Sequence, residues 1–144
     1  MKIIKSIQDH IKPIAENMRS QDIEELSKVD QTPEDALNAG LACAECYTVI
    51  HNDKPVMMFG LQGMGLSTAI VWALGTDDIL TMKKQFINES KLWRDAFLRE
   101  WQTLYNYVDV DNSESIKWLK YLGATFNKPQ PRGTGVFMRF EFNV

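Results

Sequence analysis

Two carboxylates lie at the end of a predicted strand, where a general base would be of use. Alternating apolar and polar residues favour a strand over residues 103–110, and Asp109 and Asp111 come at its carboxyl end. Open sheets bind ligands beyond the carboxyl ends of their strands, and a carboxylate there can take up a proton. The two could therefore act as a base and its partner. Asp111 is equally suited to form a turn with Asn112, which is the interpretation we favour for Asp111.

Two lysines begin the longest predicted helix, which the spacing of its aromatic residues places over residues 80–101. Acidic residues are the usual choice in a first helical turn, because the free N–H groups there carry partial positive charge. Lys83 and Lys84 at this point would instead suit an anion such as phosphate. A solvated basic helix end is the interpretation we favour for them.

A glycine-rich segment, Gly60-Leu61-Gln62-Gly63-Met64-Gly65, has the spacing of a phosphate-binding loop. The apolar run after it, Thr68 to Leu74, is short for a helix and contains β-forming residues such as Ile70 and Val71. We therefore expect a hairpin turn between two strands, with a phosphate loop as the alternative.

Cys43 and Cys46 form a Cys-x-x-Cys pair. A structural zinc site needs four ligands, and the chain has neither a second such pair nor paired histidines nearby. The pair closes a predicted helix, whereas a redox pair normally opens one. His10 and His51 are isolated in sequence, so they do not assemble a nucleophilic triad. We expect buried free cysteines and no metal.

The elements that position these residues follow from hydrophobic periodicity and turn residues. A helix over 9–26 is expected to break near Arg19-Ser20, and Thr32 before Pro33 marks a helix start. Strands are expected over 2–7, 46–51, 56–61, 68–74, 103–110, 124–126 and 136–142, and helices over 9–26, from 32 onward, over 80–101 and over 113–122.

This order predicts a single domain, 1–144, of the α/β (α+β) class: a mixed sheet with helices on both faces. The formal net charge of −3 disfavours a nucleic-acid partner, which would usually require a basic excess. No apolar run approaches the roughly 18 residues of a membrane span, and the start lacks the pattern of a signal peptide. We expect a soluble cytosolic protein that binds neither membrane nor nucleic acid.

Residues 103–126 carry the most specific pattern. A strand is followed by Asn112, a short helix with aromatic residues, Leu122-Gly123 and a further strand, and in this order the chain resembles the GNAT superfamily of N-acetyltransferases. A second set of residues is similar to the small internal virion protein family of short-tailed (podovirus-type) phages, whose members look like divergent GNAT domains. That set is Leu104-Tyr105-Asn106-Tyr107-Val108, Asn112-Ser113, Ile116, Leu119-Lys120, Gly123-Ala124, Phe126, Val71-Trp72 and Thr76-Asp77.

The GNAT resemblance implies a mostly antiparallel sheet of six to seven strands with a splayed parallel pair, residues 68–74 and 103–110. It implies acetyl-CoA as the cofactor. Free backbone groups of the splayed strands would hold the pantetheine, and amides at the start of the long helix would hold the pyrophosphate. The cofactor-contacting residues implied in this way are Trp72, Ala73, Leu74, Thr76, Thr81, Lys83, Lys84 and Asn112.

The phosphate loop departs from the superfamily pattern Gln/Arg-x-x-Gly-x-Gly/Ala. Residues 76–82 contain no glycine, and Asp77 and Asp78 would repel a phosphate. Lys83 and Lys84 would compensate only in part.

The usual tyrosine acid is also missing, because Leu119 stands at its position. Tyr105 or Tyr107, beside the presumed thioester, would have to act as the acid, with Asp109 as the base. Each tyrosine is equally suited to pack as an ordinary aromatic on the sheet.

Two functions are therefore expected to compete. The first, towards which the sequence leans, is an acetyl-CoA-dependent N-acetyltransferase acting on a host protein or small amine. The alternative is a catalytically degenerate GNAT fold that serves as an internal virion, assembly or host-takeover interaction protein. The phage resemblance implies the host cytoplasm, with possible association with the virion, for either one.

Overall fold

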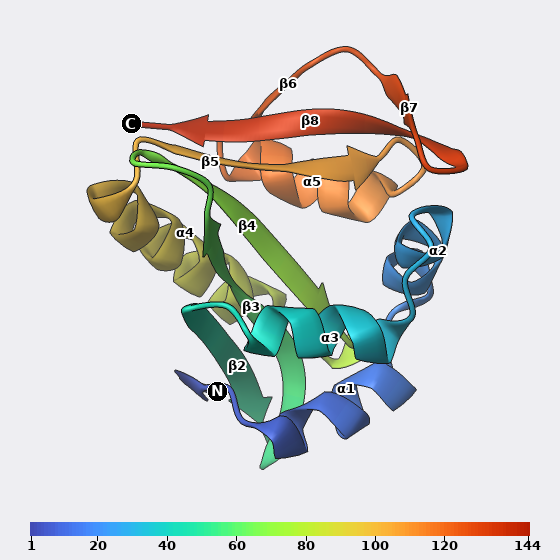
Figure 1. Ribbon diagram of the computed structural model, residues 1–144. Helices are drawn as coiled ribbons and strands as arrows, with labels where there is room; N and C mark the ends of the chain where they lie inside the picture. The colour runs from blue at the N-terminus through green and yellow to red at the C-terminus, as the bar shows by residue number, and fades with distance from the viewer.

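One sheet of eight strands runs through the computed structural model, which describes residues 1–144 (Figure 1). Its strand order is β1-β2-β3-β4-β5-β8-β6, and β7 also pairs with β8. Only β4 and β5 are parallel, so the expected mixed and mostly antiparallel sheet is confirmed. The strands are β1 (Lys2–Lys5), β2 (Glu45–His51), β3 (Lys54–Gly63), β4 (Thr68–Gly75), β5 (Thr103–Asp109), β6 (Thr125–Phe126), β7 (Gln130–Arg132) and β8 (Gly135–Asn143).

The helices follow the predicted order. The break expected near Arg19-Ser20 is confirmed, since one helix ends at Glu16 and the next begins at Ser20. The hydroxyl of Thr32 accepts the Asp35 N–H at 3.1 Å, which makes Thr32 the expected cap. The helices are η1 (Gln8–His10), α1 (Ile11–Glu16), α2 (Ser20–Lys28), α3 (Pro33–Leu41), η2 (Asp77–Met82), α4 (Lys83–Glu100) and α5 (Ser113–Tyr121).

Apart from shifts of one or two residues at element ends, two features differ from the prediction. The long helix begins at Lys83 instead of residue 80, because the Thr76 hydroxyl accepts the Asp78 N–H and starts the separate 3₁₀ helix η2. The sheet has one strand more than expected, since β7 around Pro131 consists of three exposed residues that no periodicity marks.

Helices cover both faces of the sheet, as expected. Side chains alternate between faces along a strand, so Met58 packs in the cluster of α1–α3 and Met57 packs with Ile79 and Met82 of η2. A third cluster joins Phe97 of α4 to Leu119 of α5 over β4, β5 and β8. Figure 1 shows α1 and α3 on one side of β2–β4 and α4 on the other.

The parallel strands β4 and β5 separate after three paired residues. Thr68, Ala69 and Ile70 pair with Thr103, Leu104 and Tyr105, and the pairing stops there. Beyond this point β4 stays with β3 as far as Gly75, and β5 stays with β8 as far as Asp109. The splayed parallel pair is therefore confirmed, and we call the gap between its arms the V.

The glycine-rich segment is the turn of the β3–β4 hairpin. β3 ends at Gly63, and the Met64 N–H donates to the Thr68 carbonyl at 2.8 Å. Gly65 has a φ of 124°, which a residue with a side chain rarely adopts. The expected hairpin turn is confirmed, and the phosphate-loop alternative is wrong. Separately, none of the helices is both long enough and apolar enough to cross a bilayer.

Candidate functional site

A cavity of about 320 Å³ lies at the V, between its two arms and the helices α2 and α3. Trp72, Ala73 and Leu74 line it from β4, and Asn106 and Tyr107 line it from β5. Its size falls at the lower end of the range of small-molecule pockets. The cavity is therefore the candidate site for a cofactor or a substrate.

The chain's own groups take up most of the β4 edge that faces this gap. Successive residues of a strand point their backbone groups to opposite edges, so Val71, Ala73 and Gly75 share the edge towards β5. The Asn106 amide donates to the Val71 carbonyl at 2.9 Å. The Gly75 N–H donates to the Asp22 carboxylate at 3.1 Å, and the Gly75 carbonyl accepts the Arg19 N–H at 2.9 Å. Ala73 alone is left facing the gap beyond the paired region.

The end of the β5 arm is held in the same way. The Glu25 carboxylate accepts the Asp109 N–H at 2.7 Å and the Asn112 side-chain amide at 3.0 Å. The Lys28 ammonium pairs with the Asp109 carboxylate and, at 3.3 Å, with Asp111. Asp109 is only 3% exposed, which makes an unpaired charge there costly. The Lys28 ammonium, which comes from α2, compensates that charge.

These contacts make α2 a strap across the open end of the V. Asp22 holds β4, whereas Glu25 and Lys28 hold β5, and the spacing of three residues places all three on one side of the helix. Before the helix, Arg19 forms an ion pair of 2.8 Å with Glu114 at the start of α5. Figure 1 shows α2 beyond the arrowheads of both strands.

Burial shifts the ionisation of the strap. It raises the pKa of the Asp22 carboxyl, which is 6% exposed, against the opposing effects of the Gly75 N–H and Arg19. Burial also raises the pKa of Glu25, opposed by the hydrogen bonds from Asp109 and Asn112. The hydrogen bond to Asp109 raises the pKa of Lys28. Shifts of this kind are typical of ion-pair networks as well as of catalytic groups.

The two candidate acids lie on one face of β5, stacked against arginines. The Arg139 guanidinium lies 3.9 Å from the ring centre of Tyr105, and that of Arg132 lies 4.0 Å from the ring centre of Tyr107. Tyr107 lines the cavity at the V, and Tyr105 is not among its lining residues. The structure therefore brings Tyr107 to the cavity, whereas the carboxylate of Asp109 is engaged with Lys28.

The expected phosphate-binding residues lie around η2. Thr76 is buried and caps η2, and the Thr81 hydroxyl donates to the Asp78 carbonyl at 2.7 Å. Lys83 and Lys84 are exposed at the start of α4, as expected. The oxygen of the Asn112 side chain accepts the Ser115 N–H at 3.3 Å, so Asn112 caps α5.

Coenzyme A does not fit these residues as they are arranged here. A bound pantetheine would need the strand-edge groups that Asn106, Asp22 and Arg19 already occupy. The segment that would receive the pyrophosphate is a 3₁₀ helix opened by two aspartates. This geometry therefore supports no step of an acyl transfer.

The remaining sequence candidates have ordinary structural roles. Cys43 and Cys46 are free, with Cys46 buried, and no group of three or more His, Cys, Asp or Glu side chains is arranged to hold a metal ion. His10 is buried and hydrogen-bonds the Thr48 hydroxyl at 2.8 Å.

The sequence analysis missed the three strap residues. Asp22, Glu25 and Lys28 look like the solvated face of an amphipathic helix, because charged residues at helical spacing usually face water. Their partners on β4 and β5 lie at least 53 positions away, beyond the reach of any local pattern.

Solved GNAT acetyltransferases share this fold. The GNAT-family acetyltransferase of Bacillus anthracis gives a TM-score of 0.73 at 13% identity, over 98% of this chain and 93% of its own. Ard1 of Thermoplasma volcanium gives 0.73 at 13% identity, over 99% and 97%. A Bacillus subtilis acetyltransferase in complex with CoA gives 0.66 at 10% identity, over 99% and 97%. At these identities the likeness establishes the GNAT-like fold alone.

Sequence comparison points to phage. The probable scaffold protein gp13 of Escherichia phage T7 is 33% identical over 73 residues, which cover 48% of this chain and 52% of that protein. The aligned part thus spans about half of this relative. A family model described as bacteriophage T7, probable scaffold protein Gp13, matches residues 48–130, more than half of the chain. The expected resemblance to a phage family is confirmed: this chain belongs to the family of the phage T7 probable scaffold protein Gp13.

Proposed function

We propose that this chain is a catalytically inactive GNAT domain that acts in virion assembly by binding other proteins. The observation that carries the proposal is the closed V, in which Asn106, Asp22 and Arg19 satisfy strand-edge groups that, by the GNAT resemblance, would hold the pantetheine of an acyl-CoA. A fold can outlast its original chemistry, because function resides in the site and not in the architecture.

Three further observations support this proposal. The relative in phage T7 is described as a probable scaffold protein. Asp77 and Asp78 stand where a phosphate would be bound, and Leu119, a buried aliphatic residue, stands where the superfamily often has its tyrosine acid. Asp109, the candidate base, is held by an ion pair in the closed V.

Titration calorimetry of acetyl-CoA and CoA into the purified protein tests the inactive state. We expect no heat at millimolar ligand, and micromolar binding would contradict the proposal. The assembly role is tested separately by following the protein with an antibody in particles isolated from infected cells. We expect it in assembling particles, and its absence from them at every stage would overturn this part.

The acetyltransferase remains the second candidate, because the cavity of about 320 Å³ reaches Tyr107 and the Ala73 edge faces the gap. This function would predict micromolar acetyl-CoA binding that is weakened by replacing Lys83 and Lys84 with Glu. It would also predict acetyl transfer to a host protein or small amine that Tyr107→Phe or Asp109→Asn abolishes. An inactive domain is expected to show neither the acetyl-CoA binding nor the acetyl transfer that these substitutions would remove.

A further inference from the structure

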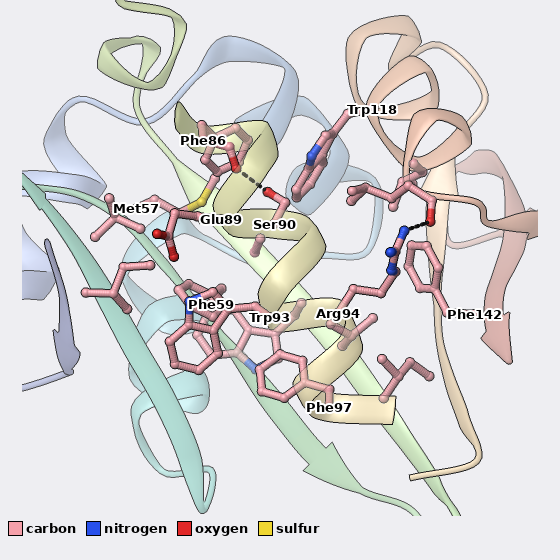
Figure 2. Close-up of a pocket in the computed structure, with 18 of the residues that line it drawn as sticks. Met57, Phe59, Phe86, Glu89, Ser90, Trp93, Arg94, Phe97, Trp118 and Phe142 are labelled. Atoms are coloured by element: carbon pink, nitrogen blue, oxygen red, sulfur yellow. Dashed lines mark hydrogen bonds between the residues drawn. The ribbon is translucent and has the colours of Figure 1, made fainter. Parts of the chain in front are cut away.

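A second cavity, of about 110 Å³, lies between α4 and the sheet (Figure 2). Figure 2 shows aromatic rings from several elements around it, with Phe59 from β3, Trp93 from α4 and Trp118 from α5. We call it the α4 slot. Its other labelled apolar walls are Met57, Phe86, Phe97 and Phe142.

The slot lies beneath the middle of α4, where Trp93 packs against the sheet but is only partly buried. Ile79 and Met82 are buried just before the helix, and Phe97 is buried in its last turn. Phe97 is the one buried residue of α4, and the small Ser90 lies in the middle of the helix, against the slot. Protein interiors are normally packed at crystal-like density, so a gap of this size lacks the contacts that its walls could make.

The slot has few polar side chains, but the buried indole N–H groups of Trp72 and Trp118 in its walls have no hydrogen-bond partner. Glu89, Ser90 and Arg94 are its only charged or hydroxyl-bearing wall residues. The Ser90 hydroxyl donates to the Phe86 carbonyl at 2.8 Å, and Arg94 donates to the Leu122 carbonyl at 2.6 Å. Apolar cavities of about 150 Å³ admit benzene, and an aromatic face is a weak acceptor for an unpaired indole N–H.

We propose that the α4 slot is a binding site for a small apolar molecule, such as an aromatic ring or a short alkyl chain. The walls supply aromatic faces and edges: Phe59 meets Trp93 edge-on at 5.1 Å between ring centres, and Phe86 lies 5.2 Å from Trp118. This proposal does not depend on the assembly role, because it concerns the packing of the sheet face beneath α4. The slot adjoins the V, since Val71, Trp72 and Ala73 of β4 line both cavities.

Benzene is the probe for the test, followed by the indole N–H signals of the four tryptophans in ¹⁵N-labelled full-length protein. Trp72, Trp93 and Trp118 line the slot, whereas Trp101 does not. We expect benzene to shift the signals of Trp72, Trp93 and Trp118 and to leave that of Trp101 unchanged. At a free benzene concentration of about ten times its Kd, Tm should rise by about 3 °C.

A variant whose side chain fills the slot gives the decisive test. Ser90→Leu extends an apolar side chain into it and is expected to raise Tm in the absence of ligand and to abolish the benzene shifts. Asn88→Leu places the same side chain on the exposed side of α4 and is expected to leave the shifts intact. The proposal is overturned if wild type shows no benzene-dependent shift, or if Ser90→Leu lowers Tm while the shifts persist.

Discussion

Asn106 links the two arms of the V just beyond the point where β4 and β5 stop pairing. Its amide donates to the Val71 carbonyl on one arm, and its side-chain oxygen accepts the Tyr107 N–H at 2.8 Å on its own arm. A half-buried side chain thus replaces strand pairing where β4 and β5 diverge. Loss of these bonds leaves two backbone groups without a partner, which costs more than the bonds themselves contribute.

We therefore predict that Asn106→Ala lowers the free energy of unfolding by about 1–3 kcal/mol. Asn143→Ala is the matched control, because Asn143 is exposed and its hydrogen bonds to Thr103 and Glu141 lie in water; it should change stability by less than about 0.5 kcal/mol. Urea unfolding of the three proteins measures both values. Equal effects of the two substitutions would show that Asn106 does not hold the V.

At the residue scale, the sequence predicted where the candidate side chains lie better than it predicted which residues they contact. The carboxyl end of β5 was predicted as the place of Asp109, and the helix start at Thr32 was predicted from residue type. The Lys28 partner of Asp109 was not predictable, because a local pattern carries no information about a contact across 81 positions. Without that partner, a buried carboxylate looks like a candidate base.

At the element scale, the strap explains why the V is closed. A single face of α2 reaches both arms, so loosening one contact should loosen the end of the other arm as well. Glu25→Ala removes the acceptor of the Asp109 N–H while leaving the helix its Asp22 and Lys28 contacts.

We predict that Glu25→Ala speeds hydrogen exchange of the Asp109 amide about tenfold or more, because an acceptor worth about 1.4 kcal/mol corresponds to one factor of ten. The Gly75 amide, held by Asp22, should follow in the same direction. Glu24→Ala changes the exposed neighbour on the same helix and should leave both amides unaffected. If Asp109 exchanges equally fast in all three proteins, α2 does not act as a strap.

Elements with a clear period were predicted, and those set by tertiary contacts were not. The alternation in β8 and the break between α1 and α2 were visible in the sequence. The 3₁₀ helix η2 was not, since its residues also fit the first turn of a longer α-helix. β7 carries a proline and is held by its pairing with β8 and by the stacking of Arg132 on Tyr107, contacts that its own three residues do not encode.

At the scale of the whole molecule, the strap should give stability an unusual dependence on pH. Burial raises the pKa of Asp22 in the folded protein above its ordinary value of 3.8. Between the two pKa values the folded chain binds more protons than the unfolded chain, so the contribution of this group to stability falls as pH rises. The sign is opposite to that of a salt-bridged carboxylate whose pKa is lowered, which loses its contribution as pH falls.

We predict that Asp22→Asn, which keeps an acceptor for the Gly75 N–H and removes the buried charge, is at least as stable as wild type at pH 7. Its advantage should shrink as pH falls through the raised pKa of Asp22, because the wild-type carboxyl then becomes neutral as well. Urea unfolding of both proteins at a series of pH values gives this difference, in which titrations common to the two chains cancel. Glu24→Gln, an exposed change on the same helix, should give a flat difference over the same range. The opposite outcome is a stability advantage of Asp22→Asn that grows as pH falls. It would mean that wild-type Asp22 is stabilised in its charged form by Arg19. The strap would then act through an ion pair and not through a buried hydrogen-bond acceptor for the end of β4.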